Sequence, residues 1–447
     1  MTFVRNLRRL LRHDRFRKLF TIRALTQCAD GTLQIGMASH ILFNPAQQPT
    51  AWAIAAMFAI TLMPFSIVGP FVSGYLDRWS RRTTAVVVDA VRCVLALLIA
   101  AIIVTGAASA LVQTVLFVAL MVALALNRFV LAGLAAGLQH TIDDDEFLTA
   151  SAVMPMIGPL GVLLGGGLAA GIRLASPWPA HVADAVIFCC AAAMWACSSL
   201  VAAGLGARDL GPMVPAPRTR FAQTLAAIRD GGAHLVSRRP ALLGLTTITC
   251  QRVLYGLTLV SIILLFRIQV HGPQQTEAAM ADIGLWMGAS GVGFASSVVL
   301  VPVLAHRMGM HRTILVLLLA SAAVQLGPGQ VLNRWWLVAA SFFIGWFAQS
   351  LKICIDTVVQ AHIDDEVKGR VFVIYDVLFN AAVVLASVIA ALLVPADGLS
   401  RSVLVGIGVG YLALAAFFWL ASRSMGAAQF DRGTALGMSP RPQASEL

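Results

Sequence analysis

The sequence is poor in charge. Only 12% of its 447 residues are charged and 59% are hydrophobic, whereas an ordinary soluble domain carries about 25% charged residues. So few charges cannot cover the surface of a water-soluble chain of this length, which excludes most soluble enzymes and binding modules. The net charge of +11 would suit a nucleic-acid partner. In so apolar a chain we attribute it to basic loops that orient membrane spans, and we expect no nucleic acid.

Patterns that carry disulfide, metal or nucleotide chemistry are also missing. The seven cysteines lie in apolar stretches without paired spacing, and adjacent Cys189 and Cys190 do not make a C-x-x-C pair. No G-x-x-x-x-G-K-[ST] phosphate loop occurs, and no polar stretch is long enough for a catalytic domain. We therefore expect no enzyme activity, no cofactor and no metal site. No short apolar segment with a cleavage site follows the basic N-terminus, so we expect it to stay in the cytoplasm.

The chain has long apolar runs instead. A membrane-spanning helix needs about 20 mostly apolar residues, and twelve segments meet this requirement, although the first and seventh carry polar residues. The segments are 19–43, 51–74, 84–106, 111–139, 149–172, 182–205, 240–267, 279–304, 313–331, 335–360, 371–394 and 403–423.

One long polar interruption separates the first six segments from the last six. It contains three prolines and six arginines. We predict an all-α polytopic membrane protein with two six-helix bundles. Its parts are a basic cytoplasmic segment 1–18, a first bundle 19–205, a cytoplasmic central loop 206–239, a second bundle 240–423 and a cytoplasmic tail 424–447.

Lysine and arginine are distributed unevenly over the loops. With the N-terminus inside, 23 of the 32 fall on the cytoplasmic side, and only Arg173, Arg267, Arg334 and Arg401 fall on the other. Cytoplasmic loops of membrane proteins carry such an excess. We therefore expect both termini in the cytoplasm.

The two halves also repeat each other. The sequence Q-H-T-I-D-D-D at 139–145 closes the fourth segment, and Q-A-H-I-D-D-E at 360–366 closes the tenth, with an offset of 221 residues. A weaker echo relates the Arg-Thr pair at 82–83 to the pair at 312–313. Duplicated halves are an architecture of many secondary transporters.

At this point the residues resemble a known family. The stretch G-Y-L-D-R-W-S-R-R-T at 74–83 is similar to the G-x-L-x-D-R-x-x-R-R signature of the major facilitator superfamily, with its acidic and basic positions all present. The stretch 365–372 looks like the E-x-x-G-R-V-F segment of the macrolide-efflux and enterobactin-exporter branch, and 128–152 is similar to the same branch. The resemblance covers essentially the whole chain. It implies a twelve-helix fold in a bacterial inner membrane, and a drug:proton antiporter that confers multidrug resistance by efflux. We expect a monomer.

The signature loop suggests a cytoplasmic gate. A carboxylate at Asp77 is suited to meet the positive end of a helix dipole, and the arginines are suited to pair with carboxylates when the transporter opens outward. The alternative is a plain basic loop that only fixes orientation. The expected gate residues are Gly74, Asp77, Arg78, Arg81, Arg82, Gly369 and Arg370.

Asp30 is the main candidate for a proton-coupling carboxylate. Gln27, Asp30 and Gln34 have the i, i+3, i+7 spacing that places them on one helix face. Ionisable groups inside a span are costly, and therefore functional by default. We expect this polar stripe to face a central cavity. The alternative is a structural carboxylate paired with Arg23 or Arg128.

Further intramembrane polar residues are candidates for the substrate cavity. Arg128 suits either an anionic substrate group or a permanent ion pair that braces the first and fourth helices. Lys352 and Asp356 are spaced i, i+4 and can neutralise each other instead. We expect Asp89, Arg92 and Asp376 to be struts between helices, and Asp184 to be partly hydrated. The cavity candidates are Gln27, Gln34, Arg128, Arg252, Tyr255, Lys352 and Asp356.

The fifth segment is rich in small residues, which let helix backbones approach closely. It resembles the Gly-Pro antiporter motif of the superfamily's exporters, although two glycines come later than in that motif. The expected packing residues are Gly158, Pro159, Gly161, Gly165 and Gly166.

Three functions fit this sequence. The first is proton-coupled export of a small amphipathic compound such as a drug, siderophore or metabolite. The second is movement of a lipid or lysolipid between leaflets by the same fold. The third is a transporter-like scaffold or sensor that moves nothing. The expected partners are the substrate, protons and membrane lipids.

Overall fold

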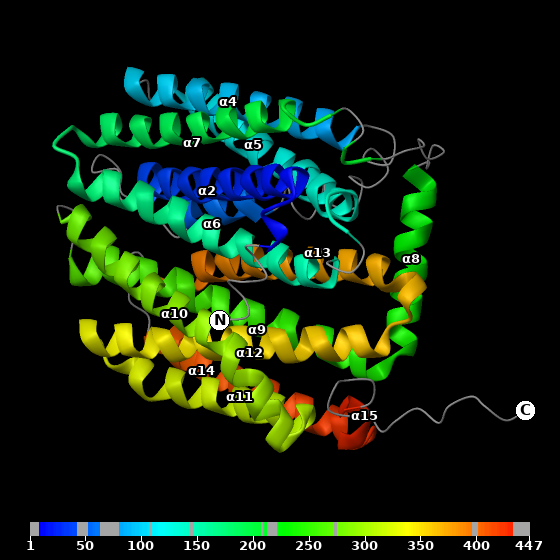
Figure 1. Cartoon of the computed structure of the whole chain (residues 1–447). Helices are drawn as coiled ribbons and strands as arrows, with labels where there is room; N and C mark the ends of the chain where they lie inside the picture. Colours follow the sequence, from blue (N-terminus) through cyan, green and yellow to red (C-terminus); the bar gives the residue numbers. More distant parts are fainter. Residues whose placement is uncertain are drawn as a thin grey trace, which may run out of the picture. The chain divides into compact units, whose positions relative to one another are not determined.

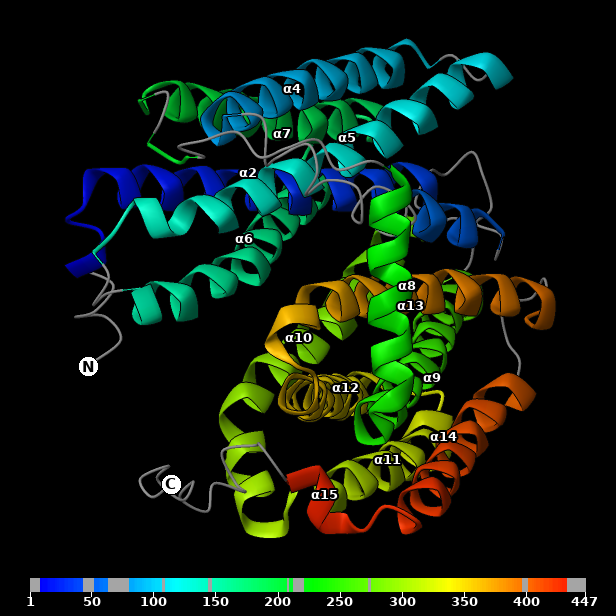
Figure 2. The same cartoon turned by 90° about the vertical axis from the view of Figure 1, so that its right-hand side faces the viewer.

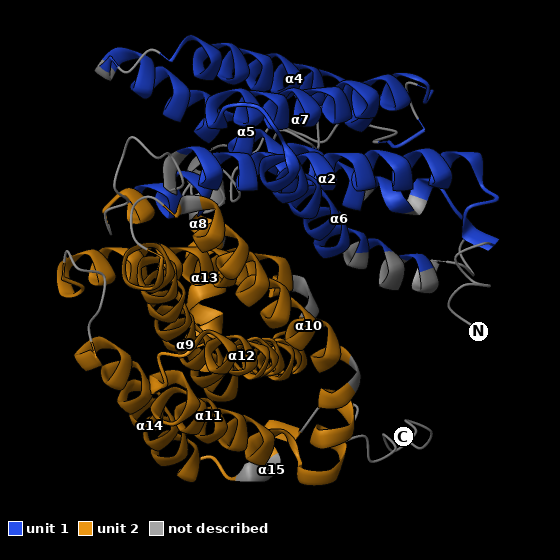
Figure 3. Ribbon diagram, turned by 90° about the vertical axis from the view of Figure 1, so that its left-hand side faces the viewer, with its two compact units in different colours: residues 1–48, 56–224 blue, residues 49–55, 225–447 orange. Residues whose placement is uncertain are grey.

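The computed structural model describes residues 9–42, 52–62, 80–106, 109–143, 147–206, 209–211, 221–271, 275–395 and 401–431. These residues form helices and connecting segments, with no strand in the ranges given (Figure 1). The chain divides into two compact units (Figure 3). Unit 1 comprises Met1–Gln48 and Ala56–Thr224, and unit 2 comprises Pro49–Ala55 and Leu225–Leu447.

The described residues of the first half form five long helices. A shorter apolar helix, Trp52–Leu62, follows the first of them. The long helices are α2 (Asp14–Leu42), α4 (Arg81–Thr105), α5 (Ala110–Gly137), α6 (Phe147–Ala175) and α7 (Ala180–Ala203), with a short 3-10 helix η1 (Leu138–His140) after α5.

The described residues of the second half form eight α-helices. In Figure 2, α12 is seen nearly end-on, and it packs against α9, α10 and α11. The elements are α8 (Phe221–Ser237), α9 (Arg239–Leu264) with the π-helical turn η3 (Leu265–Val270), α10 (Thr276–Met308), α11 (Met310–Leu326), the 3-10 turn η4 (Pro328–Gln330), α12 (Arg334–His362), α13 (Asp365–Leu393), α14 (Arg401–Arg423) and α15 (Ala427–Asp431).

Each of the twelve predicted segments coincides with a described helix, the second one only through Trp52–Leu62. Nine helices in the described part of the chain are long and apolar enough to cross a membrane, or ten if the bent α10 is one span. The bend in α10 is 51° and lies between Val298 and Leu300. The long helix α2 is not among these spans, because its polar side chains lower its hydropathy.

The two units repeat one pattern of helix packing. In unit 1, α2 packs against α6 and α7, while α4 packs against α5 and α7. In unit 2, α9 packs against α13 and α14, while α11 packs against α12 and α14. Helices at equivalent places in the two halves therefore have equivalent neighbours. This agrees with the sequence repeat at residues 139–145 and 360–366.

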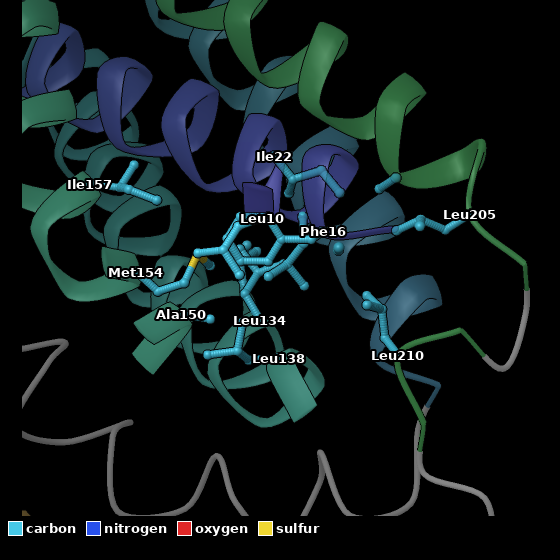
Figure 4. Close-up of a cluster of buried hydrophobic side chains, with 14 of the residues drawn as sticks. Leu10, Phe16, Ile22, Leu134, Leu138, Ala150, Met154, Ile157, Leu205 and Leu210 are labelled. Carbon is cyan, nitrogen blue, oxygen red and sulfur yellow. The ribbon is translucent and has the colours of Figure 1, made fainter. Parts of the chain in front are cut away.

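A hydrophobic cluster holds one end of unit 1 together (Figure 4). It joins Phe16 and Ile22 of α2 to Leu134 of α5, Met154 of α6 and Leu205, which follows α7. Phe16 is fully buried, and these four segments, which are distant in sequence, share one core. Large apolar side chains such as those of Leu111, Leu200 and Leu392 are exposed, as expected for surfaces that face lipid rather than water.

The central segment is more structured than the predicted loop. Helix α8 occupies Phe221–Ser237, and its Gly231 lies against Arg370 at the start of α13. Just after α8, Arg238 donates two hydrogen bonds to Asp364, at 2.9 and 3.1 Å. The 60%-exposed side chain of Asp364 joins the end of α8 to the start of α13.

Candidate functional site

The guanidinium of Arg92 is the centre of a charged cluster in unit 1. It forms an ion pair with Asp30 of α2, and its Nη1 lies 3.5 Å from Oδ1 of Asp89 on α4. Its Nε donates to the carbonyl oxygen of Ala123 on α5 at 2.9 Å, and its Cζ lies 4.1 Å from the ring centroid of Trp195 on α7. Four helices therefore converge on one arginine.

Neutral polar side chains surround the two carboxylates. Gln27 donates from Nε2 to Oδ2 of Asp30 at 2.8 Å. Oδ2 of Asp89 accepts from the hydroxyls of Thr26 and Ser198, at 2.8 and 2.6 Å. Hydrogen bonds from neutral donors spread the charge of a carboxylate without cancelling it. The net charge of the cluster is therefore set by its two carboxylates and its guanidinium alone.

That charge does not balance. With both aspartates ionised, Asp30, Asp89 and Arg92 carry one net negative charge, although each is at most 1% exposed. An uncompensated charge away from water is expensive. Binding one proton to either carboxylate would make the cluster neutral. This arrangement can therefore hold a proton at a defined place inside unit 1.

The cluster corrects two expectations. Asp30 pairs with Arg92, which is neither of the arginines, Arg23 and Arg128, that we considered as its partner. Asp30 and Gln27 also point into unit 1 against other helices rather than to an open stripe, while Gln34 is half-buried and separate from the cluster. The sequence signal that Arg92 belongs to this site was its i, i+3 spacing from the oppositely charged Asp89 in the middle of an apolar helix.

Unit 2 carries a second cluster, built from α9, α12 and α13. The guanidinium of Arg252 lies 4.1 Å from the ring centroid of Phe379 and 5.0 Å from that of Tyr255. The Nζ of Lys352 lies 5.4 Å from Phe379 and 5.3 Å from Tyr375. Two cations from different helices thus share the Phe379 ring.

The charges of this second cluster are unbalanced in the opposite sense. Lys352 donates to Oδ2 of Asp356 at 2.5 Å, which pairs one cation with the only acid among the three half-buried charges Arg252, Lys352 and Asp356. Nε of Arg252 has no hydrogen-bond partner within the described part of the chain. The group has one net positive charge and unfilled hydrogen-bonding capacity.

Four of the seven cavity candidates, Arg252, Tyr255, Lys352 and Asp356, lie in or beside this cluster, and two of its aromatic residues were not among the candidates. Tyr375 and Phe379 are one helical turn apart on α13, and their rings are stacked with centroids 6.0 Å apart. Their i, i+4 spacing was the available signal, but aromatic pairs in apolar helices usually indicate core packing. Arg128 lies on α5 of unit 1.

Four of the expected packing glycines lie against α2. A methyl group on Gly161 would come within 2.7 Å of Cβ of Gln27, and one on Gly165 would collide with the backbone carbonyl of Cys28. Gly158 and Gly166 are near Gln27 and Ile35 in the same way. Pro159 is exposed. The glycine face therefore sets the distance at which α6 passes α2, beside Asp30.

Of the expected gate residues, Gly74, Asp77 and Arg78 lie outside the described residues. Arg81 donates from Nη1 to the carbonyl oxygen of Leu210 at 2.9 Å, and Arg82 donates from Nη2 to that of Ala203 at 2.7 Å. These arginines meet backbone carbonyls at and beyond the C-terminal end of α7, where a helix attracts cations.

The residues Gly369 and Arg370, also expected at the gate, are exposed in the first turns of α13. A side chain added at Gly369 would meet no atom within 4 Å among the described residues. This position therefore imposes no packing requirement for glycine within unit 2.

A carboxylate also lies buried near a helix end in each unit. In unit 1, Oδ1 of Asp184 accepts from Ser39 at 2.6 Å and lies 3.6 Å from Nε of Arg173. Asp184 is 3% exposed, so our expectation that it is partly hydrated was wrong.

In unit 2, Oδ2 of Asp282 lies 2.7 Å from Nε2 of His271, and its Oδ1 lies 2.6 Å from Nη2 of Arg334. Asp282 is 1% exposed. Among the residues that the structure describes, no group of three or more His, Cys, Asp or Glu side chains is arranged to hold a metal ion.

Comparison with known sequences identifies the family. A profile of the Major Facilitator Superfamily matches residues 274–440. An uncharacterized MFS-type transporter of Mycobacterium tuberculosis is 30% identical over 391 residues, which cover 86% of this chain and 86% of that protein. A counterpart in Mycobacterium bovis has the same identity and coverage.

Solved structures share the fold. The nucleoside transporter NupG superposes with a TM-score of 0.66 at 12% identity, covering 90% of this chain and 98% of that structure. A D-xylose-proton symporter gives a TM-score of 0.62 at 13% identity, with coverage of 90% and 96%. At such low sequence identity these structures show a shared fold and do not identify the substrate of this chain.

Proposed function

The chain belongs to the major facilitator superfamily, and we propose that this multi-pass membrane transporter exports a small amphipathic compound in exchange for protons. In the proposal it crosses the bacterial inner membrane twelve times, has both termini in the cytoplasm and works as a monomer. Its two units alternate access to the substrate from the two sides of the membrane.

The buried cluster of Asp30, Asp89 and Arg92 is the observation that carries the proton coupling. It holds two acids and one base away from water, so uptake of a single proton removes its net charge. When Asp30 takes that proton, Arg92 remains paired with Asp89 on the same helix. The link between α2 and α4 is then weakened, which connects proton binding to a rearrangement of helices.

The substrate site in this proposal is the cluster around Arg252 and Lys352 in unit 2. Export as the direction is supported by the resemblance of residues 128–152 and 365–372 to an exporter branch. The gate proposal rests on the signature loop at 74–83. Arg81 and Arg82, at the end of that loop, donate hydrogen bonds to backbone carbonyls at and beyond the end of α7. Gly369 and Arg370 lie in the first turns of α13.

Transport in proteoliposomes with an imposed pH gradient tests this proposal. The probes are 1-naphthaleneacetate, 1-naphthaleneethanol and 1-naphthylmethylammonium, which share an aromatic body and differ in charge, and a lysophospholipid serves as the lipid probe. A trapped pH-sensitive dye reports protons. We expect at least one naphthalene probe to move against protons, and Asp30→Asn to reduce the gradient-driven flux at least tenfold.

The matched control is Asp230→Asn, because Asp230 is a 59%-exposed acid on α8. It should leave the flux unchanged. The proposal is overturned if Asp30→Asn transports at the wild-type rate under the gradient. Transport of the lysophospholipid alone would replace it with the lipid transporter, and absence of flux for every probe would replace it with the non-transporting scaffold.

A further inference from the structure

We infer that the cluster around Arg252 and Lys352 recognises an anionic amphiphile, with the two cations binding its acidic group and the rings of Phe379 and Tyr255 holding its apolar body. This inference rests on the proposed function, since it names the substrate class of the same site. The acidic group is a carboxylate or a phosphate.

The cluster around Arg252 and Lys352 has more positive than negative charge. Arg252 and Lys352 supply two positive charges, and Asp356 supplies one negative charge that is already paired with Lys352 at 2.5 Å. The guanidinium of Arg252 meets ring faces at 4.1 and 5.0 Å. Its Nε has no hydrogen-bond partner in the described part of the chain. A carboxylate or phosphate would fill this capacity with paired hydrogen bonds.

Arg92 in unit 1 also lies against an aromatic ring, but its guanidinium forms ion pairs with two aspartates and its Nε donates to a backbone carbonyl. Its Nη1 makes no hydrogen bond with a described residue, so the two arginines differ in their carboxylate neighbours rather than in complete hydrogen bonding. Within the described part of the chain Arg252 has ring contacts and no ion pair with a carboxylate, so an anionic group from outside the chain completes its surroundings.

The aromatic side chains account for the apolar part of the ligand. Both cations lie within 5.4 Å of the Phe379 ring centroid, so an acidic group bound between them brings the rest of its molecule next to that ring. Tyr255 contacts Phe294 of α10 with centroids 6.2 Å apart, which extends the aromatic surface to a further helix. Offset stacking on such rings favours flat apolar groups.

Position and exposure allow a ligand to reach this group. Arg252, Lys352 and Phe379 lie near the middle of α9, α12 and α13, the depth at which transporters of this type bind substrates. The side chains of Lys352 and Asp356 remain 31% and 26% exposed. At that depth the surroundings screen charge less than water does, so the excess positive charge attracts an anion strongly.

Isothermal titration calorimetry of the purified full-length protein in detergent tests the inference. The probes are 1-naphthaleneacetate, its neutral analogue 1-naphthaleneethanol, the cation 1-naphthylmethylammonium and lysophosphatidylglycerol. We expect 1-naphthaleneacetate to bind at least tenfold more tightly than the neutral and cationic analogues. Arg252→Gln should remove this preference, and Arg252→Lys should restore part of it. Phe379→Leu should weaken naphthaleneacetate binding while the order of the three charges is kept.

Arg423→Gln is the matched control. Arg423 also stacks on a ring, 3.9 Å from the centroid of Trp419, but it is exposed at the end of α14. This variant should bind like the wild type. Elution as a single species and unchanged circular dichroism establish that each variant is folded. Equal affinity for the neutral and anionic probes, or unchanged binding by folded Arg252→Gln, overturns the inference.

The lipid arm separates two sources of the anionic group. If lysophosphatidylglycerol binds more tightly than naphthaleneacetate and displaces it, the group belongs to a lipid, whereas the reverse order assigns it to a soluble compound. Either order requires Arg252, so both support the site. These measurements use no gradient. Anion-selective binding without pH-driven flux would therefore keep this inference and reject the proton antiport.

Discussion

Arg92 on α4 and Asp30 on α2 form an ion pair whose side chains are 0% and 1% exposed. The pair joins two helices in the middle of unit 1, and Asp89 adds a second carboxylate to the same guanidinium. Because Arg92 is paired with both carboxylates, removing any one of the three charges changes the electrostatic free energy of the other two.

Replacing Arg92 should be severely destabilising. Arg92→Gln leaves two buried carboxylates without a cation, and breaking a buried ion pair by removing one partner costs about 3–5 kcal/mol. The double variant Arg92→Gln/Asp30→Asn removes one of the stranded charges and should recover part of that loss. Thermal unfolding in detergent, followed by tryptophan fluorescence, measures both. Arg229→Gln is the control, since Arg229 is 85% exposed. Equal stability of Arg92→Gln and the control would contradict a central role of the guanidinium.

The close approach of α6 and α2 predicts a contrast between two neighbouring glycines. Gly165→Ala places a methyl group into the carbonyl of Cys28 and should lower stability by about 1–3 kcal/mol, the usual cost of overpacking. Gly167→Ala meets no described atom within 4 Å, so its stability should be unchanged or slightly higher. The two variants have the same composition, and thermal unfolding compares them directly. A similar melting temperature for both would mean that the helices separate easily at Gly165.

Exchange of a proton for an anion should respond to membrane potential. Inward movement of one proton and outward movement of one monovalent anion transfer two charges in the same sense. Each charge gains about 2.3 kcal/mol from 100 mV. An inside-negative potential, set with a potassium gradient and valinomycin, should therefore accelerate export of 1-naphthaleneacetate from proteoliposomes. Valinomycin without the potassium gradient is the control. A flux independent of potential would contradict this exchange, because inward protons and an outgoing anion transfer net charge whatever the number of protons.

The distribution of arginine and lysine predicts the orientation of the chain. A fusion of alkaline phosphatase after Pro177, between α6 and α7, should be active because the predicted topology places that segment outside the cytoplasm. A fusion after Arg238, between α8 and α9, should be inactive, and a green fluorescent protein fused at either place should show the opposite pattern. An active phosphatase at Arg238 would reverse the predicted topology.

Much of the fold could be predicted from sequence because the bilayer restricts it. Apolar runs of about 20 residues located every described α-helix except α8 and the short α15, including α9 and α12 with their intramembrane charges. Helix α8 was missed because its segment is polar and proline-containing, and only contacts such as that of Gly231 with Arg370 show that it packs on α13.

The candidate sites were predicted less completely. Spacing along one helix found Asp30 with Gln27, and Lys352 with Asp356. It could not show that Arg92 reaches Asp30, 62 residues away, or that Phe379 lies between Arg252 and Lys352. Such pairs depend on which helices are neighbours and how they are rotated, and neither is encoded in the period of a single helix.

The ion pair between Asp30 and Arg92 also has a consequence for biosynthesis. Helix α2 leaves the ribosome first and is too polar to count among the described membrane spans, while the cation that compensates its aspartate is made only with α4. The last partners of Asp89 and Arg92, Ser198 and Trp195, come with α7. Because a charged group in lipid is costly, we expect the early helices of unit 1 to be held together, sheltered from lipid, until α7 has been synthesised.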